Sequence, residues 1–253
     1  MSKSASSAWW YPAPKRPALQ GSEVHVWRAS LERNRPCVQS LKRILSEDEQ
    51  ARAERVHSEQ DRERFIVARG VLRVILSRYL DTEPSQLRFR YSPHGKPDLD
   101  NTSAEKTLSF NMSHSSGLAL YAVTRDRKVG IDLERIRTNF VYQRIAERFF
   151  SPQEKAMLDA LEAEPERRKA FFDCWTRKEA YIKAKGKGLS LPLDQFDVSL
   201  TPGEPASLLE VRGDSLEASR WWMHELFPGP GYAAALAIEG HGCRLACWEW
   251  QER

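Results

Sequence analysis

Three acidic residues and one lysine are spaced in a way that suits chemistry on a phosphate group. Asp132 and Glu134 are two apart in VGIDLE, a predicted strand, so their carboxylates project to the same side. Glu179 and Lys183 are four apart in WTRKEAYIKAKGKG, which places them on one face of a predicted helix. Because Mg²⁺ binds a few carboxylates together with water and phosphate oxygens, the three acids predict a cation site with a phosphate or pyrophosphate ligand. Lys183 would offset the charge of that ligand.

Each pair taken alone also fits a simpler arrangement, because such pairs occur on exposed helices and on solvated strand faces. Further polar residues favour the phosphate site: Ser113 and His114 in FNMSHSSG, Lys96 in the turn HGKP, and Arg64 and Arg69 in RERFIVARG. Neighbouring strand residues point to opposite faces, so Ser113 and His114 are poorly placed for a proton relay. Hydrogen bonds to a phosphate suit them better.

The composition is that of an ordinary globular protein. The chain has 253 residues, 41% of them hydrophobic, which suffices for a real core. A net charge of +4, from 39 basic and 35 acidic residues, is too small for a dedicated nucleic-acid binder but suits an acidic or phosphorylated partner. No membrane span or secretory signal is recognisable, and the four cysteines form no metal array. We therefore expect a cytoplasmic protein that binds neither nucleic acid nor membrane.

The first half of the sequence predicts helices and antiparallel strands after an irregular leader over residues 1–22. Residues 23–31 alternate as a strand, and residues 46–80 are predicted to form one long helical stretch. Residues 88–99 run from a strand into a Pro and Gly turn. Residues 108–136 are predicted as two strands joined through the turn at 126–128.

The second half repeats this composition of elements. A helix is predicted over 141–150, and Ser151, Pro152 and Glu154 have the pattern of a capped helix start. A long helix is predicted over about 166–185, with Trp175 and Ile182 burying one face. Five short alternating segments follow, at 195–200, 206–212, 220–227, 232–240 and 244–250, and predict a second antiparallel sheet. The expected fold is α+β, with halves at 23–128 and 129–253, each a long helix packed on a small antiparallel sheet.

Five ordered motifs together resemble the 4′-phosphopantetheinyl transferases of the Sfp type. The last of them matches the W-x-x-K-E-x-x-x-K signature of that family at every fixed position. The motifs are GKP at 95–97, FNMSHS at 110–115, VGIDLE at 129–134, RFFSPQE at 148–154 and WTRKEAYIKAKGKGLSLPLDQFDV at 175–198.

The resemblance implies a monomer whose two halves are related by a pseudo-twofold axis, with coenzyme A and Mg²⁺, or Mn²⁺ in its place, bound in the cleft between them. The protein substrate would be an acyl or peptidyl carrier domain of fatty-acid, polyketide or nonribosomal peptide synthesis. By the family pattern, its serine would attack the β-phosphate of coenzyme A and give the holo carrier and adenosine 3′,5′-bisphosphate. This is holo-[acyl-carrier-protein] synthase activity.

The resemblance also implies roles for individual residues. Asp132, Glu134 and Glu179 match the metal-binding acids, and Glu179 is also the preferred base for the serine proton. Lys183 matches the lysine that meets the pyrophosphate. Contacts to coenzyme A are implied for Lys96, Pro97, Ser113, His114, Asp132 and Lys183, and also for Arg64 and Arg69. We further expect an acidic carrier to dock through Phe149 or Phe150, with basic residues steering it.

Two other functions use part of the same pattern. A Mg²⁺-dependent phosphodiesterase or nuclease also needs clustered carboxylates and basic residues, but its nucleophile is water and it releases no adenosine bisphosphate. A module that binds coenzyme A or a carrier without catalysis would need the pocket, but not all three acids together with Lys183.

Overall fold

The chain folds as a mixed α+β protein. The computed structural model describes residues 10–93, 95–100, 108–186, 188–201 and 203–252. Its helices are α1 Arg35–Arg43, α2 Glu47–Glu54, α3 Glu59–Leu80, α4 Gln143–Phe149, α5 Pro152–Asp159 and α6 Glu164–Lys185. Its strands are β1 Tyr11–Pro12, β2 Glu23–Ser30, β3 Phe89–Tyr91, β4 Pro97–Leu99, β5 Leu108–Ser115, β6 Leu118–Arg125, β7 Val129–Arg135, β8 Phe196–Val198, β9 Leu208–Val211, β10 Trp221–Leu226, β11 Tyr232–Glu239 and β12 Arg244–Glu249.

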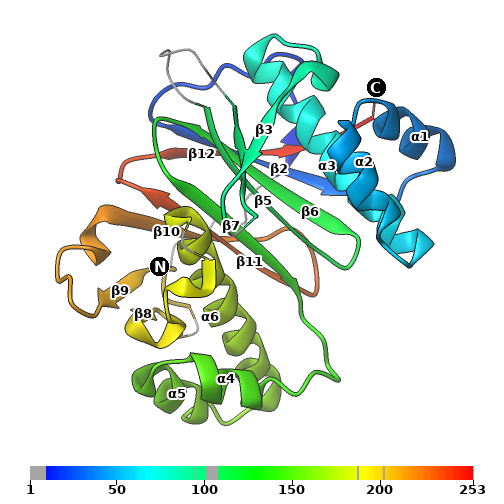
Figure 1. Ribbon diagram of the computed structural model, residues 1–253. Helices are drawn as coiled ribbons and strands as arrows, with labels where there is room; N and C mark the ends of the chain where they lie inside the picture. Colours follow the sequence, from blue (N-terminus) through cyan, green and yellow to red (C-terminus); the bar gives the residue numbers. More distant parts are fainter. Residues whose placement is uncertain (1–9, 94, 101–107, 187, 202, 253) are drawn as a thin grey trace.

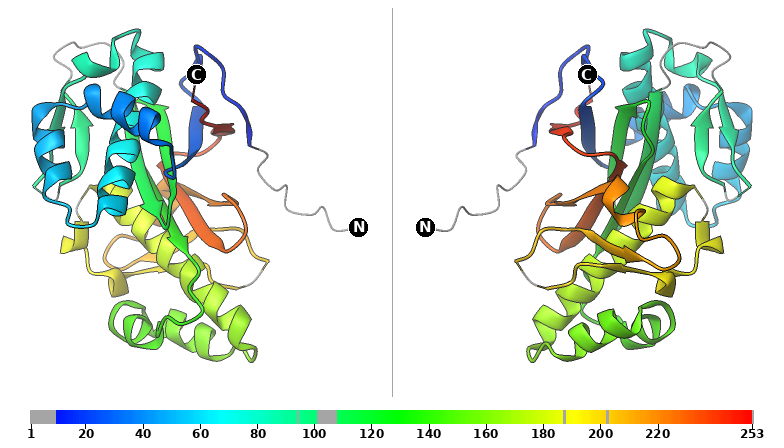
Figure 2. Two further views of the ribbon diagram at one scale, coloured as in Figure 1. Left: turned by 90° about the vertical axis from the view of Figure 1, so that its right-hand side faces the viewer. Right: turned by 90° about the vertical axis from the view of Figure 1, so that its left-hand side faces the viewer.

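Two sheets lie between two long helices, as Figure 1 shows. The alternation of side chains along each strand produces three apolar clusters. One lies between α3 and the larger sheet, where Val71 and Ile75 meet Trp27 and Tyr121. A second lies between α6 and the smaller sheet, and a third joins the two sheets to each other. Figure 2 shows α6 running along the smaller sheet, with α4 and α5 near its N-terminal end.

The larger sheet has the strand order β1-β12-β2-β6-β5. Its β2, β6 and β5 are antiparallel neighbours, whereas β12 pairs in parallel with both β2 and β1. The prediction that all five C-terminal segments form one antiparallel sheet is therefore wrong. Alternating hydrophobicity identifies a strand and its buried face, but it does not identify the partner strand. The leader also differs from expectation, because Tyr11 and Pro12 pair as a short strand; residues 1–9 lie outside the described residues.

The smaller sheet has the order β10-β11-β7, and β8 and β9 form a separate pair. On β7, Val129, Ile131 and Leu133 point into the cluster between the sheets. The intervening residues of β7 face α6, and the first of these is Gly130. A Cβ atom at Gly130 would overlap the backbone of Ala180 and Ala184 on α6. The missing side chain therefore allows the helix to approach the strand closely.

Several element boundaries differ from the sequence prediction. The stretch 46–80 is two helices, α2 and α3, because the Ser58 hydroxyl accepts a hydrogen bond from Asp61 N–H and starts a new helix. Residues 108–136 contain three strands rather than two, because a tight turn at Ser116 and Gly117 separates β5 from β6. Helix α1 was not predicted, although Asn34 caps it. The capped start at Ser151 is confirmed. No helix among the described residues is long and apolar enough to span a membrane.

Candidate active site

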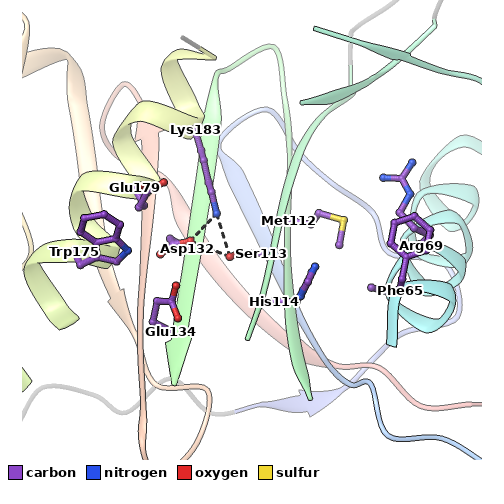
Figure 3. Close-up of a pocket in the computed structure, with 11 residues that line it drawn as sticks. Phe65, Arg69, Met112, Ser113, His114, Asp132, Glu134, Trp175, Glu179 and Lys183 are labelled. Atoms are coloured by element: carbon purple, nitrogen blue, oxygen red, sulfur yellow. Dashed lines mark hydrogen bonds and ion pairs between the residues drawn. The ribbon is translucent and has the colours of Figure 1, made fainter. Parts of the chain in front are cut away.

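One cavity of about 500 Å³ brings together most of the predicted site residues (Figure 3). Elements from both halves of the chain line it: α3, β5, β7 and α6. The lining residues are Phe65, Ala68, Arg69, Met112, Ser113, His114, Asp132, Glu134, Trp175, Glu179 and Lys183. The predicted convergence of three acids and Lys183 is therefore seen in the structure.

The local structure explains why these side chains meet. Asp132 and Glu134 lie on the face of β7 that looks toward α6, because the alternate residues of the strand are buried between the sheets. On α6, Trp175, Glu179 and Lys183 are spaced four apart and share one face. Trp175 packs against the apolar cluster beneath α6, as predicted, and it also lines the cavity. The i, i+4 spacing that paired Glu179 with Lys183 also applied to Trp175.

Asp132 is the most deeply buried acid of the cavity, with 4% of its surface exposed. Its Oδ1 accepts hydrogen bonds from Lys183 Nζ at 2.6 Å and from Ser113 Oγ at 2.9 Å, and Lys183 Nζ also lies 3.1 Å from Ser113 Oγ. Its Oδ2 is buried without a hydrogen-bond partner among the described residues. A buried carboxylate oxygen without a partner is costly, so this atom is available for a further ligand.

The other two acids are harder to ionise than usual. Burial, followed by repulsion from Asp132, raises the pKa of Glu179 to about 7. Burial and the Asp132 charge also raise the pKa of Glu134, while a hydrogen bond from Ser115 lowers it. Three carboxyl groups thus share a cavity that one lysine cannot neutralise. A divalent cation would relieve this repulsion, because it stabilises the ionised form of each acid.

The carboxylate oxygens of the three acids are suitable ligands for Mg²⁺, but they do not surround a common point. Hard oxygen donors are the ligands that Mg²⁺ prefers, and Asp132 Oδ2 is already unpartnered. In the described part of the chain, however, no group of three or more His, Cys, Asp or Glu side chains lies in a metal-binding arrangement.

A second cavity of about 360 Å³ adjoins the first and shares Met112, Glu179 and Lys183 with it. Lys96 and Pro97 line it, as predicted for a ligand-binding region. Lys96 Nζ donates to the carbonyl oxygen of Lys183 at 2.7 Å. Burial lowers the pKa of Lys96, and the nearby Lys183 charge acts in the same direction. The two cavities together could hold an elongated anionic ligand.

The two arginines predicted from α3 differ in position. Arg69 lines the first cavity, where Glu49 and the Tyr91 hydroxyl accept its hydrogen bonds. Arg64 is not among the residues that line the two cavities. Its guanidinium group pairs with Glu32 at 2.7 Å and with Asp61 at 3.3 Å. The sequence pattern places both arginines on one helix, but it does not indicate that Glu32 and Glu49, which lie far away in the sequence, are their acidic partners.

Ser113 and His114 lie near the end of β5. Figure 3 shows Ser113 on the side of Asp132 and Lys183, and His114 on the side of Phe65. Met112 and Phe65 were not predicted as lining residues. Met112 shares the alternation of β5 with His114, so the strand period could have identified it.

Two parts of the motifs have a structural role. Lys178, beside Glu179, is fully buried, forms an ion pair with Glu154 at 2.8 Å and donates to the carbonyl oxygen of Phe196. This pair joins α6 to the capped start of α5. Phe150 is also buried, with 2% exposed, so it cannot dock a carrier. Phe149 is half-buried, with its ring edge against Trp175.

Comparisons with known proteins identify the family to which this chain belongs. Residues 128–237 match the model of the 4′-phosphopantetheinyl transferase superfamily, and residues 27–125 match that of the 4′-phosphopantetheinyl transferase N-terminal region. The chain is 42% identical over 241 residues to the 4′-phosphopantetheinyl transferase HetI of Nostoc sp. strain PCC 7120, covering 95% of this chain and 98% of that protein. It is 33% identical over 157 residues to the 4′-phosphopantetheinyl transferase Sfp of Bacillus subtilis strain 168, covering 62% of this chain and 67% of that protein. The chain therefore belongs to the 4′-phosphopantetheinyl transferase superfamily and is an Sfp-like enzyme within it.

Proposed function

We propose that this enzyme transfers the 4′-phosphopantetheine group of coenzyme A to a serine of an apo acyl or peptidyl carrier domain, and releases adenosine 3′,5′-bisphosphate in a Mg²⁺-dependent reaction. The observation that carries the proposal is the convergence of Asp132, Glu134, Glu179 and Lys183 on one cavity. Family membership supports this reaction over a nuclease and over a binding module without catalysis.

The residues of the cavity can divide the work of the reaction. Asp132, Glu134 and Glu179 would hold Mg²⁺, or Mn²⁺ in its place, which supplies positive charge to the pyrophosphate. Lys183 now pairs with Asp132 and Ser113, and its ammonium group can turn to a phosphate oxygen that approaches from the adjoining cavity. Lys96, Pro97, Ser113, His114 and Arg69 would position the nucleotide end of coenzyme A, and Arg64 would join them after release from Glu32.

Glu179 is the proposed base for the carrier serine. Its carboxyl group lines both cavities, so it faces the region where the pyrophosphate and the serine would meet. A carboxylate at this position can accept the serine proton directly or through a water molecule. The half-buried Phe149 and the arginine beside it, Arg148, offer an apolar and basic contact for an acidic carrier.

The wider architecture is also part of the proposal. A division at residues 128/129 and a pseudo-twofold relation between the halves are supported by α3 and α6, which are both 22 residues long and both pack on a sheet. A monomer suffices, because a single chain lines both cavities. All four cysteines are free, which favours a reducing compartment such as the cytoplasm.

Release of nucleotide tests the identity of the nucleophile. With coenzyme A and Mg²⁺, we expect adenosine 3′,5′-bisphosphate to form in proportion to the apo-carrier added, and not in its absence. Chromatography of the nucleotides after incubation with fatty-acid, polyketide and peptide carriers measures this. Equal release with and without every carrier would indicate hydrolysis by water, and would contradict the proposed transfer.

Glu179 and Lys183 should have separable effects. Glu179→Gln keeps the shape but removes the charge and the base, so we expect a severe loss in kcat, about 100-fold or more. Lys183→Ala removes a phosphate partner, so KM for coenzyme A should rise with a smaller loss in kcat. Steady-state kinetics over a range of coenzyme A and Mg²⁺ concentrations measure both effects. Extra Mg²⁺ should not rescue Glu179→Gln, and full rescue would reduce Glu179 to a metal ligand alone.

A further inference from the structure

One edge of β7 faces β5, and the two strands are joined there by hydrogen bonds to side chains and not by backbone-to-backbone pairing. The other edge of β7 pairs with β11 in the smaller sheet, whereas β5 lies in the larger sheet. Across the gap, Asn111 Oδ1 accepts a hydrogen bond from Ile131 N–H at 2.9 Å, and Ser115 Oγ accepts one from Arg135 N–H at 3.1 Å. Both β5 residues project toward β7, because Asn111, Ser113 and Ser115 alternate along the strand.

Ser115 also contacts the carboxylate of Glu134. Its hydroxyl donates to Glu134 Oε2 at 3.1 Å while it accepts from Arg135 N–H. A serine hydroxyl has one proton to donate, so the accepted backbone hydrogen bond leaves that proton for the carboxylate. Among the described residues, Ser115 provides the only side-chain hydrogen bond to Glu134. The hydrogen bond from Ser115 therefore favours the observed rotamer of Glu134.

The backbone holds Ser115 at a fixed place. Ser115 directly precedes the turn of the β5–β6 hairpin, where Ser116 and Gly117 have φ of +46° and +85°. The Tyr232 hydroxyl on β11 donates to the Ser116 carbonyl at 2.8 Å, and Leu31 N–H donates to the Gly117 carbonyl at 2.7 Å. The turn is thus fastened to strand β11 on one side and to the segment after β2 on the other.

We propose that Ser115 is a positioning residue that orients Glu134 for cation binding and holds the β7 end of the site against β5. This inference rests on the proposed function, because it takes Glu134 as a cation ligand. Carboxylate ligands are commonly held by a hydrogen bond from a neighbouring group, and removing such a partner typically weakens metal affinity about 10- to 100-fold. The hydroxyl, not the bulk of residue 115, supplies this effect.

The variants Ser115→Thr and Ser115→Val test the proposal, because threonine and valine have the same shape as each other. Both add a branch at Cβ, which a strand tolerates, but only threonine keeps the hydroxyl. Mn²⁺ binding in the presence of coenzyme A is followed by the electron paramagnetic resonance signal of free Mn²⁺. We expect Ser115→Val to raise the Mn²⁺ dissociation constant about 10- to 100-fold, and Ser115→Thr to stay within about threefold of the unchanged enzyme. Melting temperatures without metal report the fold separately.

The matched control is Ser109→Ala, on the same face of β5 but without a hydrogen bond to β7 in the described chain. It should bind Mn²⁺ as the unchanged enzyme does. If Ser115→Val lowers the melting temperature yet binds Mn²⁺ normally, Ser115 is only structural and the inference is overturned. Equal loss in the Thr and Val variants also overturns it, because bulk would then be the cause. If the unchanged enzyme binds no Mn²⁺, the proposed cation site fails instead.

Discussion

Asp132→Asn is expected to reduce phosphopantetheine transfer at least about 1,000-fold while the protein stays folded. A bound divalent cation contributes several kcal/mol to stabilising phosphoryl charge, and about 4 kcal/mol corresponds to this factor. Asparagine keeps the shape of Asp132 and can still accept hydrogen bonds from Lys183 and Ser113. The substitution removes the charge and changes the chemistry of the buried oxygen that lacks a partner, Oδ2.

Initial rates at saturating coenzyme A and carrier, together with circular dichroism, provide the measurement. Asp98→Asn is the matched control, because Asp98 pairs with Arg90 on the exposed β3–β4 hairpin. It should retain nearly full activity. An Asp132→Asn enzyme with more than about a tenth of normal activity would show that Asp132 is not an essential ligand.

Gly130→Ala is expected to destabilise the fold by about 3 kcal/mol or more and to inactivate what remains folded. The added Cβ would overlap the Ala180 carbonyl oxygen and the Ala184 amide nitrogen, which are backbone atoms of α6 and cannot rotate away. The helix must then move from β7, which would separate Lys183 from Asp132. Urea unfolding and transfer rates measure the two effects.

Gly21→Ala provides the comparison for Gly130→Ala. A Cβ at Gly21 has no atom within 4 Å among the described residues, and its φ is not positive. Its stability should therefore change by less than about 1 kcal/mol. Normal stability of Gly130→Ala would mean that α6 and β7 need not be in close contact.

Much of the site could be predicted because its residues follow simple periods. The two-residue spacing of Asp132 and Glu134 and the four-residue spacing of Glu179 and Lys183 each fix a common face within one element. The apolar residues that alternate with the two acids determine which face of β7 is buried. The structure confirms that all four side chains line one cavity.

The parts that were not predicted depend on contacts between distant elements. No local pattern indicates that β12 returns to pair in parallel with β2, or that Glu32 pairs with Arg64. The buried position of Phe150 beside the half-buried Phe149 likewise depends on α6, whose Phe171 stacks on Phe150. Local sequence specifies which face of an element is apolar, whereas the tertiary partner specifies which residues of that face are accessible.

The most direct test of the account is the intact mass of an apo-carrier after incubation with this enzyme and coenzyme A. With Mg²⁺ present, we expect the carrier to gain the mass of one phosphopantetheine group, and a carrier whose reactive serine is replaced by alanine to gain none. With EDTA, or with the Asp132→Asn enzyme, the gain should disappear. No gain on fatty-acid, polyketide or peptide carriers with Mg²⁺, or an undiminished gain in EDTA, would contradict a metal-dependent transferase built on these residues.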